Sequence, residues 1–143
     1  MLRAMTLAPV VAEIIVPVTP TEAFVGFTAQ MGEWWDPLLS PDPTSFTSIE
    51  IDPEGDVATC HGDERHVWGR VTTWDPAGHY VQDFWLGHEQ KDASVLDVRF
   101  IGQDADSRTL VHLEHRGWPA GSEPTGIHAQ WEALLARFAS HVS

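Results

Sequence analysis

His115 is the side chain that this sequence places best for moving a proton. It ends the segment 111–115, Val-His-Leu-Glu-His, in which alternation puts Val111, Leu113 and His115 on the apolar face of a strand. An imidazole with an ordinary pKa of ~6.5 can orient a ligand or act as a general acid or base near neutrality. In the alternative, which we favour, His115 is structural and donates to a backbone carbonyl near the turn at Gly117.

Arg70 could place a cation in an apolar pocket. It shares strand parity with Trp68 and Trp74, so a concave face there would hold a guanidinium that selects a carboxylate-bearing ligand. In the slightly favoured alternative, Val71 points inward and Arg70 lies at the surface, since charged groups are seldom buried without a partner. In the enzymatic alternative, His115 would move protons together with Arg70 or Asp83.

The segment 60–66, Cys-His-Gly-Asp-Glu-Arg-His, gathers several residue types that bind metals. It has one cysteine and no second Cys/His pair at ligand spacing, so we interpret it as a solvated hairpin. The sequence also lacks a glycine-rich phosphate loop, a G-x-S-x-G segment and an H-E-x-x-H segment. We therefore predict no metal and no cofactor.

Charge excludes two classes of partner. The chain has 143 residues, with 8 Lys+Arg against 21 Asp+Glu, and a formal charge of −13. We expect no nucleic acid and no anionic membrane as a partner, because both are bound by clustered Lys and Arg. No apolar run approaches the ~20 residues that span a bilayer, so we expect a cytoplasmic protein. The acidity is interpreted as a solubility device rather than a surface for a basic partner.

The elements that must position these side chains follow from periodicity and turn residues. Val10–Val18 is predicted as a strand, and Thr19-Pro20-Thr21-Glu22 has the form of a capping box that starts a short helix ending at Gly32. Apolar spacing predicts a long helix from Ile127 to about His141. Between the helices, turn residues separate six predicted strands: Ser45–Ile51, Val57–His61, His66–Trp74, Tyr80–Leu86, Ser94–Ile101 and Thr109–His115.

This order predicts a single α+β domain over residues 1–143. A curved antiparallel sheet of about seven strands would bury its apolar face on the last helix and leave a concave apolar space between them. Leu96, Val98 and Phe100 should face this interior, with Asp97 in water. Of Trp34 and Trp35, we expect one inward and one partly exposed. Alternation does not orient the strand Tyr80–Leu86.

Five segments in this order resemble the START-like (SRPBCC) superfamily. They are T-P-T-E-A-F at 19–24, W-W-D-P at 34–37, G-R-V-T-T-W-D-P at 69–76, T-L-V-H-L-E-H-R-G-W at 109–118 and Q-W-E-A-L-L at 130–135. The resemblance is narrower to the bacterial branch named after the activator of the heat-shock-chaperone ATPase. It implies a helix-grip fold, with the C-terminal helix clasped by the sheet around a hydrophobic ligand cavity.

We expect this protein to hold a small apolar or amphipathic molecule without covalent chemistry. The alternatives are an enzyme of the cyclase/dehydratase kind and an acidic protein that docks on a chaperone or another partner, and a homodimer is left open. The residues expected to contact the ligand are Phe27, Trp35, Trp68, Arg70, Phe84, Phe100, His115, Trp131 and Leu135.

Overall fold

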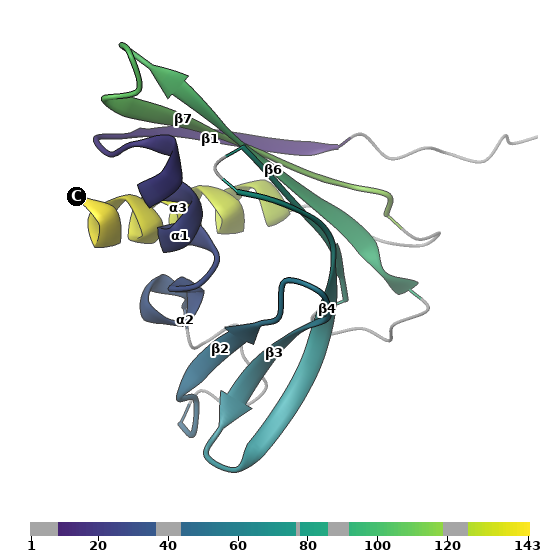
Figure 1. The fold of residues 1–143 in the computed structure, drawn as a ribbon. Helices are drawn as coiled ribbons and strands as arrows, with labels where there is room; N and C mark the ends of the chain where they lie inside the picture. The colour runs from purple at the N-terminus through teal and green to yellow at the C-terminus, as the bar shows by residue number, and fades with distance from the viewer. Residues whose placement is uncertain (1–8, 37–43, 77, 86–91, 119–125) are drawn as a thin grey trace, which may run out of the picture.

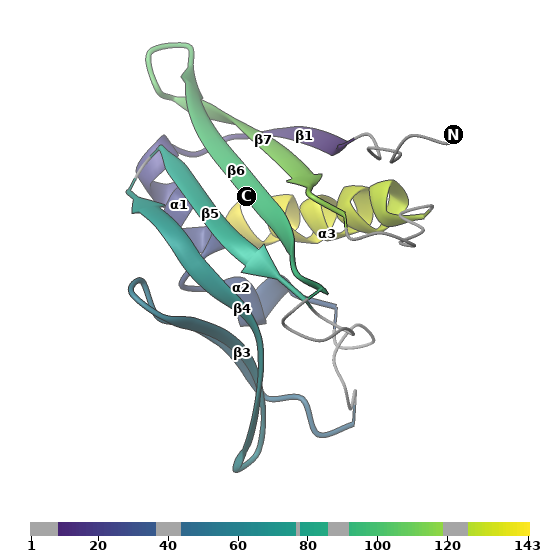
Figure 2. The same ribbon diagram turned by 90° about the vertical axis from the view of Figure 1, so that its right-hand side faces the viewer.

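The computed structural model describes residues 9–36, 44–76, 78–85, 92–118 and 126–143. These residues form an antiparallel seven-stranded sheet in the order β1-β7-β6-β5-β4-β3-β2, with the helices on one of its faces (Figures 1 and 2). The strands are β1 (Val10–Val16), β2 (Ser48–Ile51), β3 (Asp56–His61), β4 (Glu64–Asp75), β5 (His79–Phe84), β6 (Ser94–Gln103) and β7 (Arg108–Arg116). The helices are α1 (Pro20–Phe27), α2 (Met31–Trp34) and α3 (Ile127–Val142).

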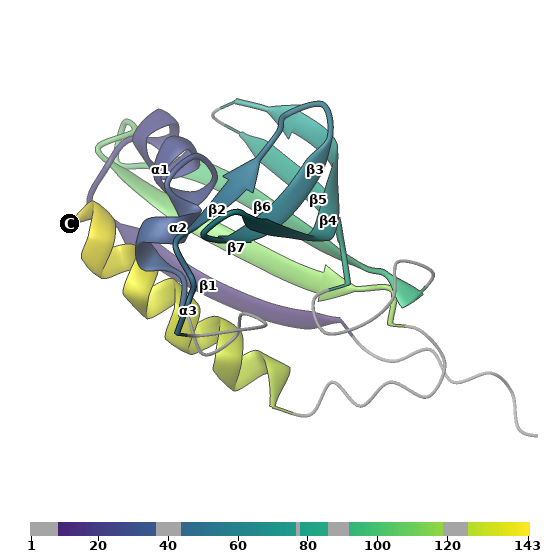
Figure 3. The same ribbon diagram turned by 90° about the horizontal axis from the view of Figure 1, so that it is seen from below.

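The sheet curls, and α3 covers only part of its inner face. α3 contacts β1, α1 and α2, whereas the hairpin of β3 and β4 extends away from it (Figures 1 and 3). The predicted α+β class, strand number and long C-terminal helix are confirmed. In the described residues, no helix has the length and apolarity needed to cross a membrane.

The predicted capping box starts α1. Thr19 Oγ1 accepts from the Glu22 backbone N–H at 3.2 Å, and Glu22 Oε1 accepts from the Thr19 N–H at 3.2 Å. Both bonds satisfy N–H groups that a helix start leaves unpaired. The predicted end at Gly32 is wrong, because α1 ends at Phe27 and a separate short helix, α2, follows.

Gly32 has a packing role instead of a capping role. A Cβ atom at Gly32 would lie 2.6 Å from the backbone nitrogen of Ile49, so glycine lets α2 approach β2 closely. The next two tryptophans are both buried, at 1% exposed for Trp34 and 2% for Trp35. The expectation that one would be partly exposed is therefore wrong. Trp34 donates from Nε1 to the Gly26 carbonyl at 2.9 Å.

The structure confirms the predicted inner face of β6 and corrects the expected exposure of Asp97. Leu96, Val98 and Phe100 are buried in the core, as predicted. Asp97 points to the outer face but is only 8% exposed, because His79 Nε2 at 2.6 Å and Arg116 Nη1 at 2.9 Å cover it. Burial raises the pKa of Asp97, but the hydrogen bonds and charges of His79 and Arg116 outweigh burial and hold it below its usual value.

The structure orients β5, which alternation left open. Tyr80 and Gln82 face the interior, and the Tyr80 hydroxyl donates to Gln82 Oε1 at 2.7 Å. Burial raises the pKa of Tyr80, so this hydroxyl keeps its proton. Gly69 of β4 makes room for the amide, since a Cβ there would lie 2.4 Å from Gln82 Nε2. The expected strand end at Leu86 lies outside the described residues, as do Pro37 and residues 119–125, which fall in the connection between the last predicted strand and the long helix.

Candidate functional site

Five rings from five separate parts of the chain meet at one end of the interior, and we call them the aromatic layer. They are Trp35 after α2, Trp68 of β4, Phe84 of β5, His115 of β7 and Trp131 of α3. Trp35 and Trp68 are stacked at 5.5 Å between ring centroids, with 28° between the planes. Phe84 lies edge-on to Trp68 at 5.1 Å and to His115 at 4.6 Å. Trp131 lies 6.2 Å from Trp35 and 6.0 Å from His115.

A chain of hydrogen bonds fixes the orientation of His115. Trp131 Nε1 lies 3.0 Å from His115 Nδ1, and an indole N–H can only donate, so Nδ1 accepts. The ring proton therefore sits on Nε2, which donates to Ser94 Oγ at 2.6 Å. The Ser94 hydroxyl donates in turn to the Phe84 carbonyl at 3.1 Å. Each polar atom in this chain has a partner.

Burial keeps His115 neutral. The residue is 1% exposed, and burial lowers the pKa of His115 to about 3. Among the described residues, its ring contacts Phe84, Ser94, Trp118 and Trp131, none of which is charged. Burial in a low-dielectric site without a compensating charge disfavours the imidazolium. In this structure, both ring nitrogens are engaged and neither is positioned as a free general acid or base.

The candidate catalytic partners of His115 lie elsewhere. Arg70 is exposed on the outer face of β4, where its Nη1 lies 3.7 Å from Asp56 Oδ1, and it pairs in register with Asp83 of β5. The structure therefore places Arg70 at the surface, the alternative slightly favoured from the sequence, and apart from the other residues predicted to contact a ligand. Regular alternation would put Arg70 on the same face as Trp68 and Trp74, but β4 is irregular on both sides of Arg70. Its pairing with β3 shifts next to Trp68, and its pairing with β5 shifts between Val71 and Thr73.

Two other predicted residues, Phe27 and Phe100, belong to a different group of rings, which we call the packed end. Phe27 lies 5.8 Å from Phe100 and 5.5 Å from Phe138, and Phe24 lies 5.3 Å from Phe100. All four are at most 4% exposed. Trp34 links the packed end to the aromatic layer, since its ring lies 5.1 Å from Phe27 and 6.0 Å from Trp35. Leu135 is buried one turn beyond Trp131 on α3.

Three buried indole N–H groups in or against the aromatic layer lack a hydrogen-bond partner, and two further unpartnered polar atoms lie on β3. In the described residues they are Trp35 Nε1, Thr59 Oγ1, His61 Nε2, Trp68 Nε1 and Trp118 Nε1. Trp118 packs on His115 at 4.2 Å. Folded proteins contain few such atoms, and each costs about 1–3 kcal/mol when it stays unpaired.

Sequence reasoning missed Thr59 and His61. The segment 60–66 was predicted to be solvated, which is wrong for His61, because it is 5% exposed and contacts Phe46 at 6.0 Å between ring centroids. The available signal was alternation: Val57, Thr59 and His61 occupy every second position of β3 and share its inner face. In the part of the chain that the structure describes, no three His, Cys, Asp or Glu side chains are placed to hold a metal ion.

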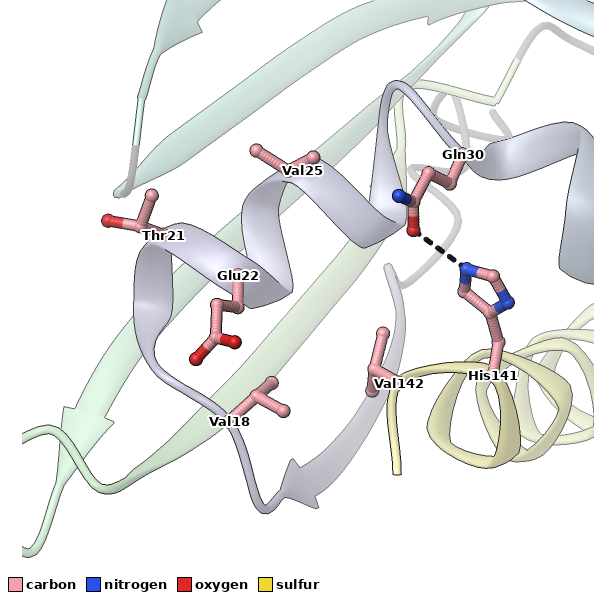
Figure 4. Close-up of a pocket in the computed structure, with 7 residues that line it drawn as sticks. All are labelled: Val18, Thr21, Glu22, Val25, Gln30, His141 and Val142. Carbon is pink, nitrogen blue, oxygen red and sulfur yellow. Dashed lines mark hydrogen bonds between the residues drawn. The ribbon is translucent and has the colours of Figure 1, made fainter.

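A pocket of about 390 Å³ lies between α1 and the end of α3 (Figure 4). His141 Nε2 and Gln30 Oε1 meet across it at 2.8 Å. It lies about 16 Å along α3 from Trp131, at 1.5 Å per residue. It contains none of the residues predicted to contact a ligand, and is lined by Val18, Thr21, Glu22, Val25, Gln30, His141 and Val142.

Comparison with known proteins supports this architecture. The family model described as activator of Hsp90 ATPase homolog 1-like protein matches residues 18–143. No curated protein sequence matches the chain at a significant level.

Solved structures with low sequence identity share the fold. A protein from Mesorhizobium loti has a TM-score of 0.70 and 14% identity, covering 94% of this chain and 96% of that one. The Aha1 dimer from Colwellia psychrerythraea has a TM-score of 0.67 and 12% identity, covering 95% and 96%. Txn09, described as an anthrahydroquino-gamma-pyrone synthase and solved as a complex, has a TM-score of 0.61 and 22% identity, covering 96% and 98%.

Proposed function

The chain belongs to the activator of Hsp90 ATPase homolog 1-like family, and from this premise we propose that it binds an apolar or amphipathic small molecule at the aromatic layer, between the sheet and α3. The observation that carries the proposal is the group of unpartnered polar atoms in and beside this layer. A ligand with polar atoms would satisfy them, which the protein alone does not do.

The nature of the lining further supports a small-molecule site. Ligand sites are mostly apolar and aromatic, with a few placed polar groups. The aromatic layer combines the rings of Phe84 and Trp131 with the unpartnered indole N–H groups of Trp35 and Trp68. One solved neighbour supports a small-molecule ligand by its description: Txn09, an anthrahydroquino-gamma-pyrone synthase that was solved as a complex.

Binding without covalent chemistry is the form of the proposal that the geometry favours. The enzymatic alternative needs a proton carrier, and His115 has both nitrogens occupied and a pKa of about 3. Arg70, its suggested partner, lies at the surface with Asp56. The cytoplasmic location expected from the sequence remains part of the proposal.

Thermal unfolding with added ligand tests the proposed function. A ligand that binds only the folded state stabilises it by about 2.7 kcal/mol at a concentration 100 times its Kd. We expect stabilisation by at least one flat aromatic compound such as fluorene or 9-fluorenone. Replacing Phe84→Leu should weaken the binding about tenfold, because it removes ring contact at the centre of the layer.

The matched control is Phe24→Leu at the packed end. It should lower the free energy of unfolding by about 1 kcal/mol and leave the ligand Kd unchanged. The proposal is contradicted if no aromatic compound stabilises the chain up to its solubility limit. Equal losses of affinity in both variants would move the site away from the aromatic layer.

A homodimer is a separate proposal for this chain. The Colwellia neighbour is described as a dimer, and here β1 is an edge strand with Val11 41% and Ile15 50% exposed. Edge strands with exposed apolar side chains tend to pair with another chain. Sedimentation velocity over a hundredfold concentration range should show a dimer that Ile15→Glu disrupts and Val25→Glu does not. A monomer at all concentrations contradicts this proposal.

A further inference from the structure

Resting on the proposed function, we propose a chemical class for the ligand: a flat, uncharged aromatic compound whose ring carries carbonyl or phenol oxygens. Its oxygens would accept hydrogen bonds from the indole N–H groups of Trp35 and Trp68. The following observations carry this inference, and they separate it from binding of a hydrocarbon or a fatty acid.

Trp35 and Trp68 present two hydrogen-bond donors without acceptors. Their side chains are 2% and 3% exposed, and neither Nε1 atom has a partner. An indole N–H only donates, so an oxygen or nitrogen acceptor is what satisfies it. The other buried tryptophans all have an acceptor: Trp34 donates to Gly26 O, Trp85 to Val67 O and Trp131 to His115 Nδ1. Of the three unpaired indoles in the described residues, Trp35 and Trp68 stack on each other at 5.5 Å, whereas Trp118 packs on His115.

Two further unpartnered polar atoms lie on the inner face of the neighbouring strand β3. Thr59 is fully buried with Oγ1 unpaired, and His61 has Nε2 unpaired while Nδ1 lies 3.1 Å from Ser45 Oγ. The residues that flank Trp68 on β4, Val67 and Gly69, pair in register with Ala58 and Val57 of β3. Trp68 therefore lies opposite the junction of Val57 and Ala58, and Thr59 is the next residue of β3. His61 lies farther along the hairpin, opposite Glu64, so of the two only the Thr59 hydroxyl is placed to meet a second oxygen on the same ligand.

The charges near the layer favour a neutral ligand. Arg70 points to the outer face and pairs with Asp56, so no guanidinium faces inward from β4 to meet a carboxylate. His115 is neutral, and its donor is committed to Ser94. Arg137 of α3 reaches Trp35, but its Nε and Nη2 already donate to the backbone carbonyls of Trp34 and Trp35. Among the described residues, a carboxylate buried at the layer would therefore lose its hydration without gaining an uncommitted cation. A fatty acid would also leave the indole N–H groups facing methylene carbons.

Entry of the ligand must rearrange the layer. The unpaired atoms have essentially no solvent-exposed surface, so the side chains that cover them move when oxygen atoms reach them. We expect Trp35 or Trp68 to rotate out of the stacked pair, since an indole N–H lies in its ring plane and must turn that edge towards the ligand oxygen.

A matched pair of ligands tests the inference. Fluorene and 9-fluorenone have the same flat three-ring skeleton and differ by a CH₂ group against a carbonyl. We expect isothermal titration to give an approximately tenfold lower Kd for 9-fluorenone than for fluorene, the size of one hydrogen bond to a buried donor. Trp68→Phe and Trp35→Phe keep a ring and remove the N–H, so at least one of them should reduce this ratio to about one. Trp74→Phe, at the packed end beside Phe24, should keep the ratio.

Each result separates the inference from the proposed function. If both compounds bind equally well to the unmodified chain, the oxygen-bearing class is wrong while a site for flat apolar molecules stands. If the ratio of the two Kd values survives both Trp35→Phe and Trp68→Phe, these indoles are not the donors. If oleate binds more tightly than 9-fluorenone, the ligand is a lipid and the inference is overturned. If none of the three binds, the proposed function itself fails.

Discussion

The substitution His115→Gln is expected to make the free energy of unfolding much less dependent on pH in mild acid. Burial lowers the pKa of His115 to about 3, against about 6.5 in an unfolded chain. Between these values, the unfolded chain binds more protons at this residue than the folded chain. The free energy of unfolding therefore rises with pH across this window. The contribution is fully present above about pH 6.5 and decreases as the pH falls towards 3.

The size of the effect follows from the same linkage. His115 alone should lower the free energy of unfolding by about 2 kcal/mol between pH 7 and pH 5, with a slope of up to ~1.4 kcal/mol per pH unit. Glutamine cannot be protonated in this range but offers one acceptor and one donor group to Trp131 and Ser94. At pH 8 the variant should be less stable than the unmodified chain, by about 1–3 kcal/mol, because its hydrogen bonds fit less well.

Urea unfolding of both proteins from pH 5 to pH 8 measures this prediction. The difference between them should shrink by about 2 kcal/mol as the pH falls from 7 to 5. Trp131→Phe is the control, because it removes the donor to His115 Nδ1 but keeps a histidine that titrates. Its pH profile should stay steep. Parallel profiles for the unmodified chain and His115→Gln would show that the imidazole is not held neutral by burial.

Gly32→Ala is expected to destabilise the protein although Gly32 lies within a helix. Alanine normally favours a helix by about 1 kcal/mol over glycine. Here the added methyl group would lie 2.6 Å from the Ile49 backbone nitrogen and 3.2 Å from Ser48 Cα, so α2 must move away from β2. Backbone atoms in a sheet cannot rotate away as a side chain does, and overpacking of this kind costs about 1–3 kcal/mol. Trp34 and Trp35 follow directly, so the shift should also disturb the aromatic layer.

Gly26→Ala in α1 is the matched comparison. The closest atom to its added methyl group is Val142 Cγ1 at 2.7 Å, which belongs to a side chain in the last turn of α3 and can rotate. Denaturant unfolding should give Gly26→Ala a free energy of unfolding within about 1 kcal/mol of that of the unmodified chain. This value should be clearly higher than that of Gly32→Ala. Similar stabilities for the two variants would mean that the contact between α2 and β2 adjusts without cost.

The sequence predicted the fold more fully than the site, for a physical reason. Alternation and capping are local properties of the sequence. Residue spacing could therefore predict the succession of strands along the chain, the capping box at Thr19 and the inward side chains of β6 and β7. The errors arise where tertiary contacts or strand irregularities override spacing. Gly32 looked like a helix end but serves close packing on β2, and irregular pairing of β4 reversed the side on which Arg70 lies.

The candidate site depends on contacts that no single segment shows. His115 was identified as an inward residue from its strand, but its partners come from β6 and α3, with Ser94 and Trp131 each 16 or more positions away. Which indole N–H groups find acceptors depends on the packed tertiary arrangement. The sequence therefore predicted buried tryptophans, but could not indicate that Trp35 and Trp68 lack hydrogen-bond partners while Trp34 and Trp131 have them.

Indole N–H resonances in a two-dimensional NMR titration test most directly whether a small molecule lodges in the aromatic layer. Addition of 9-fluorenone should shift the Trp35 and Trp68 signals with saturation, and leave the signal of Trp74, at the packed end, in place. Single Trp→Phe variants assign each signal. If no indole signal moves up to the solubility limit, or if only Trp74 responds, the aromatic layer is solid core and the small-molecule proposal is wrong.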